Sequence, residues 1–309
     1  MASAAGDRQK VAVIGAGGIG GWLAAELEAA GHEVLLCLRK PFERLVVRSN
    51  GVEREIPVAI VTKPDLQSPL PWVFVTTKAH DTAGAASWLS HLTDGATIVV
   101  ALQNGIDHHA RIAPFVGQAT ILPALSYAAV ERIGPGRTVH HKGYQIIVPA
   151  GAAGAALARL VAGSRLEIRQ EDDFLTAAWR KLLSNLAANP LTALTLQRIG
   201  VIHDPDIREL ARGVLHEGAR VAAAEGARLA NADGDAILDE LGGYSRDGGS
   251  SMLYDRLAGR PLEHEFLTGA VVRAAERHKI DVPLNRALLA LLRALDGAIR
   301  SGAVSTRRD

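Results

Sequence analysis

The first half of the chain alternates short apolar runs with stretches of helical periodicity. Residues 10–14 form a β-branched run that ends at Gly15, and residues 19–30 follow as a predicted helix that Gly31 terminates. Residues 32–38 form the next apolar run, which predicts a βαβ unit of about 30 residues. Similar apolar runs follow at 72–76, 96–102 and 120–122. Apolar strands that alternate with helices indicate a parallel sheet with helices on both faces.

The pattern changes near residue 170. A polar, acidic stretch at 170–173 precedes a Leu- and Ala-rich stretch at 174–196, and acidic residues suit a helix N-terminus. Further helices are predicted at 206–224, 233–241, 262–278 and 283–300. Residues 137–148 alternate more and are predicted as later strands, antiparallel and at an edge. The expected α/β fold is therefore a Rossmann-type domain over 1–171 followed by an all-helical domain over 172–309.

Composition and charge exclude several classes of protein. Lys plus Arg total 34 and Asp plus Glu total 33, a balance that argues against a nucleic-acid-binding surface. The single cysteine, Cys37, excludes an internal disulfide and is expected to be a buried small hydrophobe. No HExxH motif or His/Cys array indicates a metal site. No run of about 18 apolar residues occurs, so no membrane span is expected. The N-terminal residues do not resemble a signal peptide, so a cytoplasmic location is expected.

A glycine-rich hexapeptide follows the first predicted strand. It consists of Gly15, Ala16, Gly17, Gly18, Ile19 and Gly20. It matches GxGxxG between a strand and a helix, in a βαβ unit of the required length. Gly15 permits the tight turn, Gly17 lets the backbone approach a pyrophosphate, and Gly20 allows close helix–strand packing. The helix N-terminus would supply N–H groups to the anion, although a plain glycine turn is the alternative.

The end of the second predicted strand indicates which dinucleotide the turn would bind. A carboxylate there would bind the ribose 2′-hydroxyl of NAD. The chain has Arg39 and Lys40 instead, with no carboxylate before Glu43. Because Arg pairs a 2′-phosphate bidentately, NADP (NADPH) is the predicted cofactor. The alternative is a pair of solvated charges at a strand end.

Three polar residues are spaced along one face of the first C-terminal helix. Lys181, Asn185 and Asn189 lie at i, i+4 and i+8 among leucines and alanines. A helix this apolar should be largely buried, so an amine and two amides need partners or a wet cleft. We favour a stripe that faces a ligand, although a buried Asn is more often structural.

Several segments resemble the ketopantoate reductase (2-dehydropantoate 2-reductase) family. They occur in the family's order and span nearly the whole chain: GAGGIG (15–20), Arg39, TTKAH (76–80), LQNGI (102–106), WRKLLSNLAANPLTAL (179–194) and SSMLYDRLAGRPLEHE (250–265). The resemblance implies NADPH-dependent reduction of a 2-oxo acid to a 2-hydroxy acid, in pantothenate and coenzyme A synthesis. It also implies a helical domain like the C-terminal domain of 6-phosphogluconate dehydrogenase.

The resemblance assigns roles to individual residues. Its implied catalytic residues are Lys181 as proton donor, with Asn104 and Glu263 beside the nicotinamide. Further implied contacts are Lys78 and the backbone of Ala129 to the cofactor, and Asn185, Asn189 and Ser251 to the substrate. A protonated amine suits this reaction, because hydride delivery to a ketone develops alkoxide charge on its oxygen.

The residues alone leave other interpretations open. Glu263 follows Pro261 in a predicted first helical turn, where an acid also suits the helix dipole. Lys78 and Asn104 each follow an apolar strand, where open α/β sheets bind ligands, but loops there are ordinarily polar. Ser251 follows two glycines and fits a flexible polar loop.

The chain departs from the family pattern on the substrate side. Ile199 and Thr268 stand where family members carry asparagine, and the segment that begins at Glu263 has His264 at its second position. Ketopantoate in the cleft between the sheet edge and the helical domain is the first hypothesis for the substrate. Another 2-oxo acid or ketone is the second, and a non-catalytic NADP sensor is the third. A homodimer is the candidate assembly.

Overall fold

The computed structural model describes residues 8–303, which form two compact units. The first contains the described residues up to 103 together with 107–174, and the second contains 104–106 and the described residues from 175 onward. The division after residue 174 lies a few residues beyond the predicted one. The short segment 104–106, expected with the sheet, clusters with the helical unit. The roles assigned to the two parts remain predictions.

A six-stranded parallel sheet forms the centre of the first unit. Its strands are β1 (Lys10–Ile14), β2 (Glu33–Cys37), β5 (Ala59–Val61), β6 (Trp72–Val75), β7 (Ile98–Ala101) and β8 (Thr120–Pro123). They lie in the order β5-β2-β1-β6-β7-β8, and every neighbouring pair is parallel. The order reverses between β1 and β6, and ligands of such sheets bind outside the carboxyl ends of the strands at this point.

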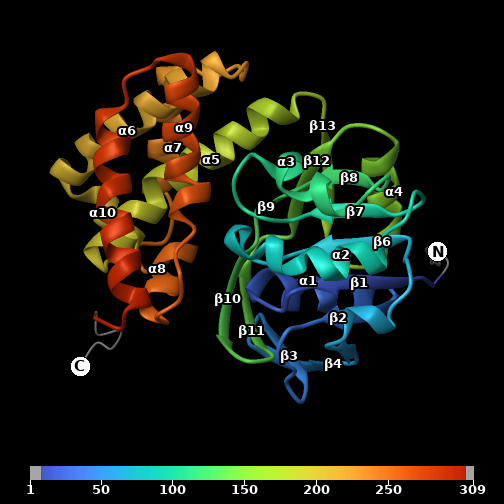
Figure 1. Ribbon diagram of the computed structural model, residues 1–309. Helices are drawn as coiled ribbons and strands as arrows, with labels where there is room; N and C mark the ends of the chain where they lie inside the picture. The colour runs from blue at the N-terminus through green and yellow to red at the C-terminus, as the bar shows by residue number, and fades with distance from the viewer. Residues whose placement is uncertain (1–7, 304–309) are drawn as a thin grey trace. The chain divides into compact units, whose positions relative to one another are not determined.

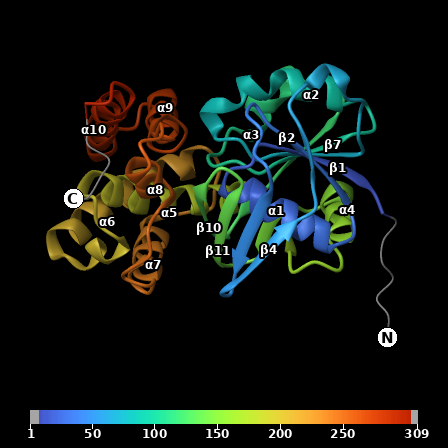
Figure 2. The ribbon, with the colours of Figure 1, turned by 90° about the horizontal axis from the view of Figure 1, so that it is seen from below.

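Helices cover both faces of this sheet (Figure 2). Helices α1 (Gly18–Ala29) and α4 (Ala152–Leu160) lie on one face, and α2 (Ala86–Leu92) and α3 (His108–Ile112) lie on the other. Side chains of a strand point alternately to the two faces. Val11 and Val13 accordingly pack with α1, whereas Ala12 and Ile14 pack with α2. The predicted α/β fold with helices on both faces is confirmed.

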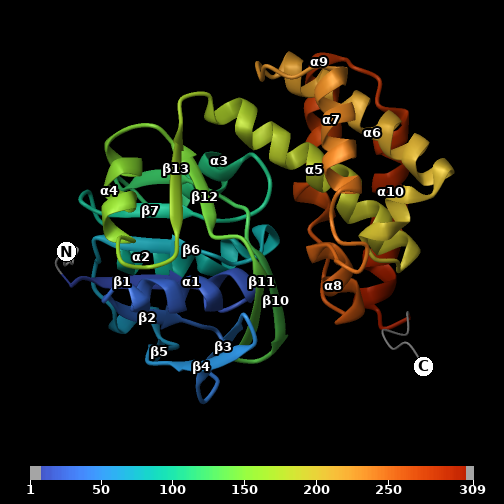
Figure 3. The ribbon, with the colours of Figure 1, turned by 180° about the vertical axis from the view of Figure 1, so that it is seen from behind.

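Two smaller sheets complete the first unit (Figure 3). One joins β3 (Leu45–Ser49), β4 (Val52–Ile56), β10 (Ala129–Gly134) and β11 (Arg137–Lys142); the other joins β9 (Leu125–Ser126), β12 (Gln145–Pro149) and β13 (Glu167–Glu171). Strand β11 is antiparallel to β10 but parallel to β3, so residues 137–148 contain strands of mixed direction. The predicted edge position is wrong, because β11 and β12 are each paired on both sides. Glu171 pairs with Pro149 in β12, so the acidic stretch 170–173 ends a strand and only then precedes a helix.

The second unit is all-helical among its described residues (Figure 1). Its long helices are α5 (Phe174–Thr195), α6 (Pro205–Ala224), α7 (Asn231–Gly242), α9 (Thr268–His278) and α10 (Pro283–Arg300), with the short α8 (Ser251–Leu257) between α7 and α9. One apolar core joins all of these helices. The predicted all-helical second part is confirmed.

The predicted helix at 262–278 is wrong in its first turn. A short 3₁₀ turn, η6 (His264–Phe266), comes first, and α9 begins only at Thr268. Leu267 has φ −110° and ψ −91°, which is outside the helical region. The backbone N–H of Leu262 donates to Asp296 Oδ1 on α10 at 2.7 Å, so a tertiary contact holds the segment away from the helix.

Two further observations bear on the predictions from composition. Cys37 is buried in β2, and burial raises the pKa of its thiol to about 12, as expected for a packing residue. Within residues 8–303, none of the helices is long and apolar enough to cross a membrane.

Candidate active site

The glycine turn lies at the carboxyl end of β1 and leads directly into α1. Gly15 has φ +97°, a left-handed conformation that favours glycine. At Gly20, a Cβ would lie 1.9 Å from the carbonyl oxygen of Gly15, so only glycine lets the helix approach the turn this closely. At Gly17, a Cβ would meet nothing within 4 Å. The turn is therefore packed tightly at its two ends and open at its middle.

The strand beside β1 holds the turn in place. Thr76 Oγ1, at the end of β6, donates to the carbonyl oxygens of Ile14 and Gly15 at 3.0 and 2.7 Å. On the other side, the Gly15 N–H donates to the carbonyl of Cys37 at 3.0 Å. Hydrogen bonds to residues at the ends of both neighbouring strands, β2 and β6, therefore hold the turn in place.

These features fit a dinucleotide pyrophosphate. Gly17 is the N-cap of α1, no side chain caps this helix end, and no acidic residue occupies its first turn. Uncapped N–H groups at a helix N-terminus attract an anion. The open middle of the turn leaves room for phosphate oxygens to reach the backbone. The chain's own residues therefore provide the donors and the space that such a cofactor requires.

Of the other residues predicted to bind the cofactor in the first unit, Arg39 and Lys78 follow strands of the central sheet, and Ala129 lies in a second sheet. Arg39 follows β2 and forms an ion pair with Asp81, and Lys78 follows β6 as the N-cap of a 3₁₀ turn. Ala129 begins β10, and the carbonyl of the next residue, Val130, lies 3.1 Å from where a Cβ on Gly18 would stand. The fold therefore brings Gly15–Gly20 and Ala129 close together and places Arg39 and Lys78 after the strands on either side of β1.

In the second unit, Asn104, Lys181 and Glu263 form a charged cluster. Asn104 Nδ2 donates to Glu263 Oε2 at 3.1 Å, although the two residues are 159 positions apart in the chain. The Glu263 side chain is buried, with 3% of the residue exposed. A buried carboxylate needs a partner charge or hydrogen bonds. The amide of Asn104 supplies one of these bonds.

The amine of Lys181 lies in the electric field of this carboxylate. Burial lowers the pKa of Lys181 to about 8, and the negative charge of Glu263 limits the decrease. An amine with a pKa near neutrality can hold a proton and also release it. Lys181 therefore has the protonation behaviour of a general acid. The helix-dipole interpretation of Glu263 is wrong, because α9 begins five positions later and Glu263 contacts Asn104 instead.

The two asparagines of the helix stripe differ in their surroundings. Asn185 is partly buried on α5. Asn189 is 1% exposed, and its Oδ1 accepts hydrogen bonds from the backbone N–H of Met252 at 3.1 Å and from Ser251 Oγ at 3.3 Å. The structure thus brings Asn189 and Ser251 together, and the amide of Asn189 holds the first turn of α8. Ser251 lies on this helix rather than in a flexible loop.

Sequence reasoning missed two residues of this contact. Ser250 Oγ is the N-cap of α8 and accepts from the Leu253 N–H at 3.1 Å, while Thr192 Oγ1 lies 2.7 Å from Ser250 Oγ. The signal for Thr192 is its position three residues after Asn189, on the same side of α5. The signal for Ser250 is a serine before an apolar stretch, a common helix start.

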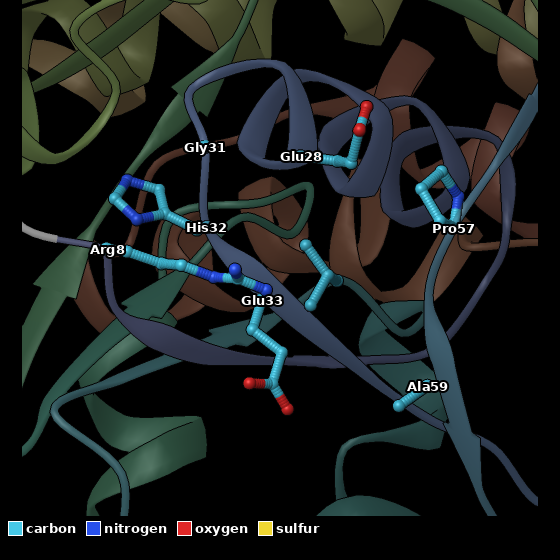
Figure 4. Close-up of a pocket in the computed structure, with 8 residues that line it drawn as sticks. Arg8, Glu28, Gly31, His32, Glu33, Pro57 and Ala59 are labelled. Atoms are coloured by element: carbon cyan, nitrogen blue, oxygen red, sulfur yellow. The ribbon is translucent and has the colours of Figure 1, made fainter. Parts of the chain in front are cut away.

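A separate cavity of about 300 Å³ lies at the opposite edge of the central sheet (Figure 4). It is lined by charged side chains of both signs, including Arg8, Glu28 and Glu33 near the start of β2. The glycine turn lies at the carboxyl ends of the strands, so this cavity is not part of the candidate site. Among the described residues, no cluster of His, Cys, Asp and Glu could hold a metal ion.

Comparison with known proteins finds family matches in both parts of the chain. Residues 11–153 match the family model "Ketopantoate reductase PanE/ApbA", and residues 173–296 match "Ketopantoate reductase PanE/ApbA C terminal". The chain belongs to the ketopantoate reductase PanE/ApbA family. The 2-dehydropantoate 2-reductase of Caulobacter vibrioides is 38% identical over 291 residues, which cover 92% of this chain and 98% of that protein.

Solved structures share the ketopantoate reductase fold. A dimeric ketopantoate reductase from Staphylococcus aureus has a TM-score of 0.85 at 28% identity, over 94% of this chain and 99% of that chain. A D-mandelate dehydrogenase solved with NADH and anilino(oxo)acetate has the same fold, with a TM-score of 0.85 at 23% identity, over 94% of this chain and 99% of that chain. The family uses a nicotinamide cofactor.

Proposed function

We propose that this protein reduces 2-dehydropantoate (ketopantoate) to pantoate with NADPH and that Lys181 donates the proton. In the balanced reaction, the 2-oxo carbon gains a hydride and its oxygen gains a proton. When bound, the nicotinamide would supply the hydride. The observation that carries the proposal is the cluster of Lys181, Glu263 and Asn104 in a chain of this family.

The amine of Lys181 has two tasks in this proposal. Its positive charge stabilises the negative charge that develops on the carbonyl oxygen, and its proton then neutralises that oxygen. Burial favours release of the proton, while the charge of Glu263 limits the decrease of the pKa, so that most of the amine is protonated at neutral pH. Asn104 fixes the carboxylate of Glu263 and thereby the field in which Lys181 acts.

The amides and the serine would bind the remaining polar groups of the substrate. The Oδ1 atom of Asn189 already accepts two hydrogen bonds from α8, so its Nδ2 is the group that would donate to the substrate. Ser251 is an exposed residue at the first position of α8, and its hydroxyl would bind the carboxylate of the substrate. Asn185, one turn after Lys181, would bind a hydroxyl group.

The proposed cofactor residues are Gly15–Gly20, Ala129, Lys78 and Arg39. The turn would bind the pyrophosphate through backbone N–H groups, and Lys78 would add a positive charge. Arg39 would bind the 2′-phosphate, because it follows β2, at whose end the 2′ position of the ribose is bound, and its side chain is 71% exposed.

The decisive experiment follows the loss of NADPH absorbance with ketopantoate and a panel of other 2-oxo acids. We expect ketopantoate to have the highest kcat/KM, with NADPH preferred over NADH. Higher kcat/KM for an unrelated 2-oxo acid would replace the proposed substrate but keep the chemistry. Tight NADPH binding without turnover of any carbonyl compound would refute the enzymatic proposal and favour a sensor.

A different 2-oxo acid or ketone is the second candidate substrate. Thr268 is completely buried, and its Oγ1 has no hydrogen-bond partner among the described residues. Ile199 is also buried, with its N–H bonded to the carbonyl of Gly248. An asparagine would present an amide where this chain has the apolar side chain of Ile199 or the single hydroxyl of Thr268, and this difference favours a substrate with fewer hydroxyl groups.

We also propose that the protein forms a homodimer in solution, because the relative from Staphylococcus aureus is described as dimeric. Sedimentation velocity would test the assembly, and a monomer across the micromolar range would refute it. The cytoplasmic location stays a prediction from the sequence.

A further inference from the structure

An ion pair lies where the cofactor's 2′-substituent is expected. Arg39 Nη2 lies 3.1 Å from Asp81 Oδ2, and Nη1 lies 3.5 Å from Oδ1. The arginine side chain is 71% exposed and the aspartate side chain is 34% exposed. The guanidinium proposed to bind a phosphate therefore already has an anionic partner in the protein.

The two residues come from strands on opposite sides of β1. Arg39 follows β2, and Asp81 ends the 3₁₀ turn η2 (Ala79–Asp81) that follows β6. Because β2 and β6 each pair with β1, they are about 10 Å apart, and the ion pair spans the sheet edge at which the glycine turn begins. The pair is thus positioned at the edge where a dinucleotide's adenosine half would lie.

Asp81 is held in a rigid turn. Its backbone N–H donates to the carbonyl of Lys78 at 2.9 Å. The next residue, Thr82, donates through Oγ1 to the carbonyl of Ala79 at 2.8 Å and accepts from Gln103 Nε2 at 3.0 Å. Since these bonds hold the turn, the carboxylate of Asp81 has a defined position. The long, exposed side chain of Arg39 is the partner that can change its conformation when a cofactor binds.

We propose that Asp81 is a specificity-determining residue, which weakens the preference for NADP(H) over NAD(H) by holding Arg39 in an ion pair. This inference rests on the proposed function of Arg39. A 2′-phosphate carries about −1.5 to −2 charges at neutral pH, so it is repelled by Asp81 and must share Arg39 with it. The 2′-hydroxyl of NAD(H) carries no charge and can donate a hydrogen bond to the carboxylate.

The test measures the dissociation constants of NADPH and NADH by calorimetry on the full-length protein and on Asp81→Asn. The asparagine keeps the size of the side chain and removes its charge. We expect NADPH to bind about fivefold more tightly, because exposed ion pairs of this kind have modest strength, and NADH to bind no more tightly than before. In an Arg39→Ala background, the gain for NADPH should become smaller.

A matched control is Glu53→Gln. Glu53 forms a similar ion pair on β4 of the same unit, with Arg137 Nη2 at 3.0 Å and both side chains 47% exposed. This variant should leave both dissociation constants unchanged. Unchanged or weaker NADPH binding in Asp81→Asn would overturn the inference, and so would an equal gain for both cofactors. The proposed function is judged separately, by reduction of ketopantoate by the unaltered protein.

Discussion

The two candidate binding regions are built from different parts of the chain. At the glycine turn the chemistry comes from the backbone, since glycines permit the conformation and N–H groups would bind the anion. On α5 the chemistry comes from side chains, since Lys181 and the asparagines supply the charge and the hydrogen-bond donors.

This difference decides how each region tolerates substitution. The backbone site is local, because six consecutive residues contain most of it. It requires residues without side chains, so that the helix and the anion can approach the backbone. The side-chain site is assembled from distant segments, because Asn104 and Glu263 meet only in the folded chain. Mutations should therefore act on packing and cofactor affinity in the first region, and on the chemical step in the second.

The largest expected effect is that of Lys181→Ala. Loss of the proton donor should lower kcat by about 10³-fold, while the dissociation constant of NADPH stays the same. Lys181→Arg keeps the positive charge but does not release a proton near neutral pH, so it should also be slow. Steady-state kinetics and calorimetry give both quantities. Full turnover by Lys181→Ala would exclude this residue as the acid.

Two glycine variants test the requirement for space. Gly20→Ala places a methyl group 1.9 Å from the Gly15 carbonyl, so the protein should lose about 3 kcal/mol of unfolding free energy and with it cofactor binding. Gly17→Ala meets no atom within 4 Å and should leave the unfolding free energy within about 0.5 kcal/mol. It should nevertheless bind NADPH more weakly, because the methyl group fills the open middle of the turn. Chemical denaturation separates the two effects, and equal destabilisation would contradict them.

Arg39→Ala should weaken NADPH binding by about tenfold and leave NADH binding nearly unchanged. The effect is moderate because the guanidinium is largely exposed. Equal losses for both cofactors would show that Arg39 does not contact the 2′-phosphate.

The pH dependence of kcat/KM reports on the side-chain cluster. The amine of Lys181 must be protonated to act as an acid, so kcat/KM should fall as the pH rises through about 8. The charge of Glu263 raises the pKa of Lys181, so Glu263→Gln should move this decline to lower pH. A decline that stays in place, or moves to higher pH, would contradict the proposed coupling of Lys181 and Glu263.

The smallest expected effect is that of Ser250→Ala. Removal of this N-cap from α8 should cost about 1 kcal/mol of unfolding free energy and raise the KM for the substrate, because Ser251 follows it. The matched control is Asp204→Ala, which removes the N-cap of α6 at a similar cost. Thermal unfolding measures both losses, and only Ser250→Ala should change KM. A change of KM in both variants would indicate a general loss of stability.

Local patterns determined much of this protein. Apolar runs with turn residues between them predicted five of the six central strands, all but the short edge strand β5, and the 3.6-residue period predicted α5, α6, α7 and α10. Glycine spacing marked the turn, because the left-handed conformation of Gly15 and the close contact of Gly20 with Gly15 involve residues near each other in the chain. The stripe of Lys181, Asn185 and Asn189 was also visible, because helical geometry alone places these residues on one face.

The tertiary structure alone decided how those residues are used. It paired Asn104 with Glu263, joined Asn189 to the start of α8, and held Leu262 against Asp296, which moved the start of α9. It also lowered the pKa of Lys181, since burial depends on every segment packed around the amine. These contacts join residues far apart in the chain. Hydrophobic periodicity and helix or strand propensity depend on neighbouring residues only, so they cannot predict contacts that form when the whole chain folds.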